Sequence, residues 1–358
     1  MKKLLLILSL FASLSLEAQY VATYGETTAS QNEGFYYFMP RTVIKLAVTI
    51  EETQYHIGPY AEFATEMLGT TDYIKENKTE TVVKSIDIQL GNEPDTESAC
   101  FIEFDEKGKE PVPNFILDYD GMLIAVGYNT LPECFDIKKN PIVYDNDDQK
   151  PELPVSFIEI IEEQEDKNAD DEEEVKKAPK KTTKKDMAKM ALDKITKIKG
   201  AYFDLVSGVN ETNYGNTISF MAENLQNIEN ECISLFKGKT TKVTYKKYFY
   251  IKPGNNEGNS NISLGKLDNG ETLKVQFETK NTTMGLNPMG DDVINTDQTN
   301  KLFYRVPAQT NVTITLGKNV ITSKTLTISQ FGEMRLIATK NNKILFNPNT
   351  GQIISIVK

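Results

Sequence analysis

The chain has 358 residues, with 40 basic and 51 acidic side chains and a formal net charge of −11 at pH 7. This acidity argues against nucleic-acid binding, because binding phosphates depends on clustered lysines and arginines that release counterions. The chain carries a single histidine, which excludes a histidine-rich zinc site of the HExxH kind.

The first residues have the pattern of a signal peptide. Lys2 and Lys3 precede an apolar run over residues 4–16, and Ala18 supplies a small residue at the expected cleavage point. A membrane-spanning helix needs roughly 20 apolar residues, so this run is too short to be one. The first cysteine is Cys100, so we expect no lipid anchor. The sequence therefore predicts export, cleavage near Ala18 and a soluble protein without a membrane span, periplasmic or associated with the outer membrane.

Residues 19–144 are predicted to form a strand-rich N-terminal domain. Aromatic and β-branched residues are dense over residues 34–49, which predicts two short strands broken at Pro40. Residues 58–69 change to a helical period and end in a glycine, which predicts a short helix. Strand patterns then resume, and Asp120-Gly121 lies between two apolar runs, as in a tight hairpin turn.

Residues 145–185 are predicted to be a charged, flexible linker. Residues 159–174 carry ten acids and one lysine, and residues 176–199 carry ten lysines and two acids. Such a segment buries too little apolar surface to offset the entropy of ordering it. An acidic patch that captures a basic partner or calcium is the alternative. Residues 145–148 (DNDD) lack the glycine and the distal glutamate of an EF-hand loop.

Residues 186–358 are predicted to form a helical hairpin followed by an antiparallel β domain. Two apolar stripes of helical period, over residues 187–205 and 218–236, end near Gly208 and Gly238. The polar connection between them is short, so the two helices are expected to be antiparallel.

The last 120 residues alternate as strands, with turn signals at Asn269-Gly270, Asn341-Asn342 and Thr350-Gly351. The fold class predicted for the whole chain is α+β. It is mainly antiparallel β, sandwich or barrel-like, with a short N-terminal helix and a central two-helix hairpin.

Three cysteines in an exported protein leave at least one unpaired. Cys100 and Cys134 lie in the same half of the chain and could form a disulfide. Cys232 falls on the apolar stripe of the second helix, which favours a buried and inert thiol.

The remaining candidate residues have structural and functional interpretations, and we favour the structural one for each. His56 precedes the short helix, where a neutral imidazole can cap or pack. Tyr245, Tyr248 and Tyr250 alternate on a strand, which indicates sheet packing before a ligand platform. Turn aspartates usually cap their own backbone; those considered as calcium ligands are Asp118, Asp120, Asp291, Asp292 and Asp297.

No GxSxG, GxxxxGK[ST] or GxGxxG motif is present. The sequence therefore predicts no catalytic, cofactor-binding or metal residue, and it predicts no cofactor. A carboxylate pair of the kind used by glycosidases stays open, because 51 acids make some pairing inevitable.

Several blocks resemble an uncharacterised Bacteroidetes family, the domain of unknown function 4831 family. They are YYFMPRTVIKLAVTIEET from Tyr36, GPYAEFATEMLG from Gly58, GAYFDLVSG from Gly200, LFKGKT from Leu235, LFYRVPA from Leu302 and ISQFGEMRLI from Ile328. The resemblance implies an exported envelope protein and brings no known activity. Arg305 and Gln330 are polar groups at strand positions in these blocks. They could be buried and paired or line a recognition surface, and we favour burial.

The function expected from the sequence is a non-enzymatic binding or assembly module of the cell envelope, with an envelope protein or a glycan as partner. The alternative is a hydrolase that acts on glycan or peptide through a carboxylate pair, one of them with a raised pKa. A purely structural role, with the helical hairpin as the docking element, is a third possibility. The sequence predicts no oligomeric state.

Overall fold

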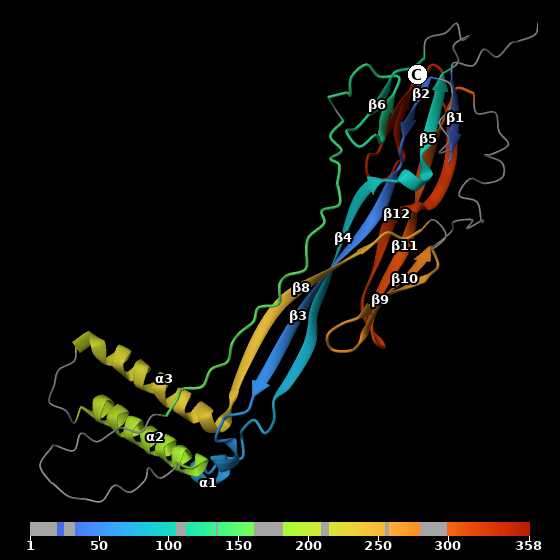
Figure 1. Cartoon of the computed structure of the whole chain (residues 1–358). Helices are drawn as coiled ribbons and strands as arrows, with labels where there is room; N and C mark the ends of the chain where they lie inside the picture. Colours follow the sequence, from blue (N-terminus) through green and yellow to red (C-terminus); the bar gives the residue numbers. More distant parts are fainter. Residues whose placement is uncertain are drawn as a thin grey trace, which may run out of the picture. The chain divides into compact units, whose positions relative to one another are not determined.

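A computed structural model describes residues 20–24, 33–104, 112–133, 135–160, 182–208, 215–254, 258–279 and 299–358 (Figure 1). The predicted signal peptide and Cys134 lie outside these residues. The chain divides into two compact units. Unit 1 comprises Met1–Val48, Ile86–Asp147 and Lys247–Lys358, and unit 2 comprises Thr49–Ser85 and Asp148–Lys246.

Each unit draws on segments from both sides of the predicted linker. Within the range 145–185, Asp148 hydrogen-bonds to the backbone of Lys246, and Ile160 is buried with 7% exposure. Residues 161–181 lie outside the described part of the chain. The predicted domain and linker boundaries therefore stay predictions.

Unit 1 contains three antiparallel sheets. The first has the order β1-β5-β2, from β1 (Tyr20–Tyr24), β2 (Gly34–Tyr37) and β5 (Cys100–Phe104). The second has the order β14-β13-β7-β6, from β6 (Phe115–Leu117), β7 (Leu123–Val126), β13 (Lys343–Phe346) and β14 (Ile353–Val357). The third has the order β12-β11-β10-β9, from β9 (Asn261–Lys266), β10 (Thr272–Thr279), β11 (Lys301–Leu316) and β12 (Asn319–Ala338).

One hydrophobic core joins the first two sheets to the paired ends of β11 and β12. Its side chains come from segments far apart in the sequence. Each strand contributes the side chains of one face, because successive side chains of a strand point to opposite faces. The buried members are Tyr20, Ala22, Tyr37, Met39, Cys100, Ile102, Leu123, Val126, Leu302, Phe303, Met334, Ile344 and Phe346.

A fourth sheet has the order β4-β3-β8, from β3 (Pro40–His56), β4 (Lys78–Pro94) and β8 (Lys239–Ile251). Each of these strands has residues in both units. β3 is the middle strand, and its residues from Thr42 to Val48 are all buried. This burial fits the mainly apolar sequence of the run, in which Thr42 and Lys45 are the two polar residues.

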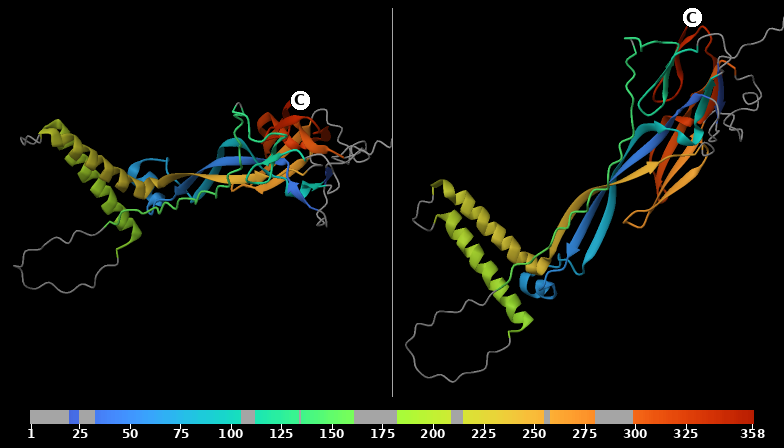
Figure 2. Two further views of the ribbon diagram at one scale, coloured as in Figure 1. Left: turned by 90° about the horizontal axis from the view of Figure 1, so that it is seen from above. Right: turned by 45° about the horizontal axis from the view of Figure 1, so that its top comes forward.

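Unit 2 holds the helices. A 3-10 turn, η1 (Ala61–Phe63), leads into α1 (Ala64–Leu68), which ends at Gly69 in the left-handed conformation. α2 (Lys184–Ser207) begins with a capping box between Thr183 and Asp186, and α3 (Ile218–Lys237) follows the 3-10 turn η3 (Gly215–Thr217). α2 and α3 lie side by side in each view of Figures 1 and 2. The remaining 3-10 turn, η2 (Thr96–Ser98), belongs to unit 1.

The predicted fold class is confirmed: the chain is mainly antiparallel β, with a short helix near residue 60 and a pair of helices in the middle of the chain. The hairpin turns predicted at Asp120-Gly121 and Asn269-Gly270 connect β6 to β7 and β9 to β10. None of the helices in the described residues combines the length and the apolar composition that crossing a membrane requires.

Candidate functional site

Unit 1 contains a buried ion pair between Arg305 of β11 and Asp95. The guanidinium Nη2 of Arg305 lies 2.9 Å from Oδ2 of Asp95, and the two side chains are 1% and 2% exposed. Arg305 also donates from Nη1 to the carbonyl oxygen of Pro40 at 3.2 Å. Charges this deeply buried need both a partner and further hydrogen bonds. Arg305 is therefore a structural residue of the strand core, as the sequence favoured.

Gln330 and Ser329 bind the backbone and side chain of Thr42 nearby. The amide of Gln330 accepts from the N–H of Thr42 at 3.0 Å and donates to its carbonyl oxygen at 2.9 Å. The hydroxyl of Thr42 donates to Oγ of Ser329 at 3.2 Å. All three side chains are buried, so Gln330 does not line an exposed surface. We call Arg305, Asp95, Thr42, Ser329 and Gln330 the buried polar cluster.

A bulge in the β11–β12 hairpin makes room for this cluster. Val306 pairs with Glu333 and Ala308 pairs with Ile328, so Pro307 on β11 stands opposite the whole segment from Ser329 to Gly332 on β12. Proline has no N–H to give to the ladder, which makes it suited to a bulge. The segment displaced by the bulge carries the two polar side chains that reach Thr42.

An open apolar groove of about 490 Å³ lies on the surface of unit 1. It lies beside β6, which is the last strand of its sheet. The groove is lined by Phe35, Phe104, Val112, Pro113, Asn114, Phe115 and Leu117. None of the lining residues that the structure describes is charged, and Asn114 is the one polar side chain among them.

Three phenylalanine rings form the apolar lining. The ring centroids of Phe35 and Phe104 are 5.9 Å apart, and those of Phe35 and Phe115 are 5.1 Å apart. The ring of Phe115 also meets that of buried Tyr20 edge to face at 5.6 Å. These distances are in the range of favourable aromatic pairs, so the rings hold one another in place.

Gly34 sets the position of Phe35. A Cβ at residue 34 would lie 2.1 Å from the carbonyl oxygen of Ile102 and 2.5 Å from the ring of Phe101. Only glycine allows β2 to approach β5 this closely. The close approach places Phe35 of β2 beside Phe104 of β5.

Comparison with known families identifies the family of the chain. The model of the domain of unknown function DUF4831 matches residues 33–354. The chain belongs to the DUF4831 family. The matched range includes the buried polar cluster, the groove residues and the helical pair of this chain. Searches of curated proteins and of solved structures gave no match.

The acidic turn of the DUF4831 domain at residues 118–120 is occupied by a lysine. Oδ1 of Asp118 accepts from the N–H groups of Asp120 and Met122, both at 2.9 Å. Lys139 forms ion pairs with Asp118, at 2.7 Å, and with Asp120. The predicted capping of the backbone by a turn aspartate is confirmed. The lysine ammonium stands where a calcium ion would need to bind.

The DNDD segment binds β8. Asp147 accepts from the N–H of Tyr248 at 2.7 Å, and Asp148 accepts from the N–H of Lys246 at 2.9 Å. Asp145 pairs with buried Lys45. These carboxylates thus accept hydrogen bonds from backbone N–H groups of β8 and form an ion pair with a lysine of β3. In the residues that the structure describes, no group of three or more potential ligands is placed to hold a metal ion. Asp291, Asp292 and Asp297 lie outside that part of the chain.

The three tyrosines of β8 do not form a platform. Tyr245 is buried with 3% exposure. The ring of Tyr248 lies under the ammonium of Lys45 at 5.1 Å, and that of Tyr250 meets the ring of Tyr144 at 4.7 Å. Burial of Tyr245 and the ring contacts of Tyr248 and Tyr250 are as expected of sheet packing.

The two described cysteines and the histidine show no catalytic arrangement among the residues that the structure describes. Cys100 is a free, buried thiol in the described residues, and burial raises its pKa to about 12. Cys232 is also buried and free, and burial raises its pKa. His56 ends β3, and its Nε2 atom is buried without a hydrogen-bond partner among the described residues. The prediction of an inert thiol at Cys232 agrees with its burial.

The groove was missed in the sequence analysis. Phe35, Phe104 and Phe115 lie on three separate strands, and each appeared only as an apolar residue in a strand pattern. One sequence feature could have indicated the groove. The apolar segment that contains Phe115 is short, and a short strand at the edge of a sheet leaves neighbouring apolar side chains exposed.

Proposed function

We propose that this chain is an exported, non-enzymatic binding module of the cell envelope, and that the apolar groove of unit 1 binds an extended, apolar segment of a partner protein. The observation that carries the proposal is the groove itself, a space of about 490 Å³ whose described lining is apolar at Phe35, Phe104, Phe115 and Leu117. Export is supported by the signal-peptide pattern of residues 1–18.

An extended segment fits because β6 is an edge strand. Its one described partner is β7, so its other side has N–H and C=O groups available to a further strand. A peptide that adds to such an edge gains main-chain hydrogen bonds, and its alternate side chains enter the neighbouring pocket. Phe115 and Leu117 alternate along β6 and both line the groove. A partner strand with apolar residues at alternate positions would match this spacing.

A protein segment fits the groove better than a glycan does. Sugars are bound through several hydrogen-bonding side chains, commonly with carboxylates and amides among them. Among the lining residues that are described, the groove offers Asn114 alone as a polar side chain, and the others are apolar. The free energy of binding therefore comes from burying apolar surface, at about 25 cal/mol for each Å² removed from water.

No observation favours the hydrolase alternative. That alternative requires a carboxyl group with a raised pKa beside a second acid. Glu51, Glu80 and Glu93 are carboxyl groups of the described residues whose pKa is shifted downward. A lowered pKa keeps a carboxylate ionised at neutral pH, which is unsuited to a general acid.

Site-specific photo-crosslinking in the producing cells tests the proposal. A benzophenone amino acid replaces Asn114, which is exposed at the groove, and in a matched control it replaces Tyr119, which is 82% exposed on the adjoining turn. We expect a protein adduct from position 114 and none of the same mass from position 119. The crosslinked peptide, mapped by mass spectrometry, should carry apolar residues at alternate positions.

A second variant separates binding from folding. Leu117→Asp places a charge in the groove, and we expect the adduct from position 114 to fall at least tenfold while circular dichroism and the melting temperature show a folded chain. Leu117→Met preserves the apolar lining and should keep the adduct. Equal adducts from positions 114 and 119, or an adduct from position 114 that the aspartate leaves unchanged, would overturn the proposal.

A further inference from the structure

The helical pair of unit 2 ends in an exposed apolar surface. We call residues 200–207 of α2 and 218–231 of α3 the hairpin tip, and residues 184–199 of α2 the hairpin base. Four large side chains of the tip stand out into solvent: Phe203 (66% exposed), Val206 (57%), Phe220 (66%) and Ile228 (45%). Exposed apolar side chains gathered on one element indicate an interaction surface more often than scattered ones do.

The core of unit 2 packs along the base, and among the described residues it meets the tip only at Leu225. The α2 residues of that core are Ala188, Ala191, Ile195 and Ile198, which all lie in the base. In the tip, Leu205 is the one fully buried side chain among the described residues. An amphipathic helix needs a partner along its whole apolar stripe, so the tip lacks the layer that the base has.

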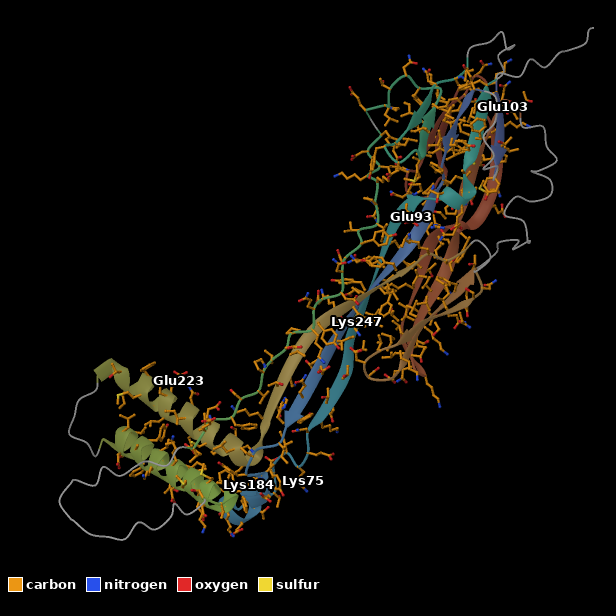
Figure 3. The ribbon with its side chains drawn as sticks, viewed as in Figure 1. Lys75, Glu93, Glu103, Lys184, Glu223 and Lys247 are labelled. Carbon is orange, nitrogen blue, oxygen red and sulfur yellow. The ribbon has the colours of Figure 1, made fainter. Side chains whose placement is uncertain are left out.

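The hairpin carries opposite charges at its two ends. From residue 200 to residue 234 the sequence has no lysine or arginine, and the described tip residues include the acids Asp204, Glu223, Glu229 and Glu231. The base has six lysines against two aspartates. Figure 3 shows Glu223 of α3 and Lys184 of α2 toward opposite ends of the helical pair.

Part of this charge is available for a partner. Lys184 and Lys185 pair with Glu62 and Glu66, and Lys199 lies 3.7 Å from Glu229. Lys189 and Lys194 of the base are exposed and form no ion pair within the described ranges. Glu223 of the tip is likewise exposed and unpaired there.

We propose that the hairpin tip is a self-association surface, which docks antiparallel on the hairpin base of a second copy of this chain. A two-fold axis makes the arrangement reciprocal, because each copy gives an acidic tip and a basic base to the other. The exposed apolar side chains of the tip are then buried between helices. α2 is about 36 Å long at 1.5 Å per residue, which is enough for the two hairpins to overlap along most of their length.

The charge pattern favours a second copy over a lipid surface. Amphipathic helices that lie on membranes carry lysine and arginine on their polar face, which attract anionic lipids. The tip has acids and no basic residue, so an anionic membrane repels it. The complementary basic surface that it needs is present on the same chain.

Sedimentation velocity on the purified full chain over a concentration series tests the surface. We expect a monomer–dimer equilibrium for the unsubstituted chain. Phe203→Asp combined with Phe220→Asp should raise the dimer dissociation constant by roughly 30-fold or more, the effect of losing a buried aromatic contact. Tyr119→Asp, an exposed aromatic residue of unit 1, is the matched control and should leave the constant unchanged.

A charge exchange tests the antiparallel arrangement. One variant carries Lys189→Glu and Lys194→Glu in the base, and the other carries Asp204→Lys and Glu223→Lys in the tip. In a dimer of either variant alone, the substituted side chains face unsubstituted residues of the same charge at both tip–base contacts. Each variant alone should therefore be monomeric. A mixture of the two restores both attractions, and we expect a mixed dimer.

Three results would overturn the inference: an unsubstituted chain that stays monomeric, charge variants that dimerise alone, or a mixture that stays monomeric although circular dichroism shows both variants folded. Binding of the unsubstituted chain to phosphatidylglycerol vesicles that depends on Phe203 and Phe220 would also contradict it. Because the groove lies in unit 1, the outcome is independent of the proposed groove function.

Discussion

Arg305 and Asp95 show how a polar side chain in a strand pattern can be a core residue. The sequence shows Arg305 between aromatic and apolar residues of a strand pattern, LFYRVPA. That pattern is compatible with a buried, paired arginine and with one that lines a recognition surface. The structure provides Asp95, which precedes η2 and is 210 residues away in sequence, as the partner. No local pattern predicts a pairing over such a separation, because it depends on how the sheets pack.

Replacement of one member of this pair should be costly. Asp95→Asn keeps the shape of the side chain but leaves the Arg305 charge buried without a counter-charge, and we expect the free energy of unfolding to fall by about 3 kcal/mol. Glu333→Gln at the exposed pair with Arg335 is the control and should cost less than about 1 kcal/mol. Urea unfolding measures both. Equal effects of the two substitutions would show that burial does not set the cost.

Glu93 predicts a pH dependence of stability. Burial alone would raise the pKa of Glu93, but hydrogen bonds from Lys252, Tyr144 and Arg41 outweigh it and hold the pKa below its ordinary value of 4.5. A carboxyl group whose pKa is lower in the folded state stabilises the fold above the unfolded pKa, and this contribution is lost as the pH falls through the folded pKa.

The effect can be isolated with Glu93→Gln. The difference in unfolding free energy between the unsubstituted chain and the variant should be constant above about pH 4.5 and should shrink as the pH falls further. Urea titrations at a series of pH values measure it, with Glu33→Gln, an exposed position, as the control. A difference that persists unchanged at the lowest pH would contradict the assigned role of Glu93.

At the scale of elements, the sequence predicted what local patterns determine. Asp120-Gly121 and Asn269-Gly270 are turns because glycine adopts positive φ there, at 78° and 81°. Gly69 and Gly208 end their helices for the same reason. These features need no knowledge of the remainder of the chain.

The β11–β12 hairpin was harder to predict. The alternation of the last 120 residues predicts strands but not their bounds, and β11 is one strand from Lys301 to Leu316 that passes through a bulge at Pro307. Proline normally argues against a central strand position, so the local rule was misleading. The groove was missed for a related reason. Alternation of apolar and polar residues along a strand indicates which face is buried, but it does not indicate which strand lies at the edge of its sheet.

The bulge makes a prediction about Gly332. A Cβ at this position would lie 1.8 Å from the carbonyl oxygen of Val306, so Gly332→Ala forces the two strands apart. We expect the free energy of unfolding to fall by about 1–3 kcal/mol. Gly200→Ala is the control, because a Cβ in that helical position meets no atom within 4 Å, and it should raise stability by up to about 1 kcal/mol. Thermal unfolding measures both, and a destabilisation by both would contradict the steric argument.

At the scale of the whole molecule, the chain places two different surfaces in two units. The apolar groove belongs to unit 1 and the hairpin tip to unit 2, and neither shares a residue with the other. Both surfaces lie within the region matched by the DUF4831 model.

Export is a prediction about the whole chain. We expect the protein purified from its own cells to begin at Gln19, because Ala18 is the small residue after the apolar run. Intact-mass spectrometry and N-terminal sequencing of the fractionated cell measure the cleavage and the location. A chain that keeps residues 1–18 and stays in the cytoplasmic fraction would contradict export.

Hydrogen exchange at β6 is the most direct measurement of the groove proposal. It compares the purified chain alone with the chain saturated by a synthetic peptide of the segment crosslinked at position 114. If the segment adds to the edge of the sheet, amides of Phe115–Leu117 exchange more slowly in the complex, while those of the other edge strand, Ile353–Val357, do not change. Unchanged exchange at β6 with bound peptide, or equal slowing at both edges, would contradict the account.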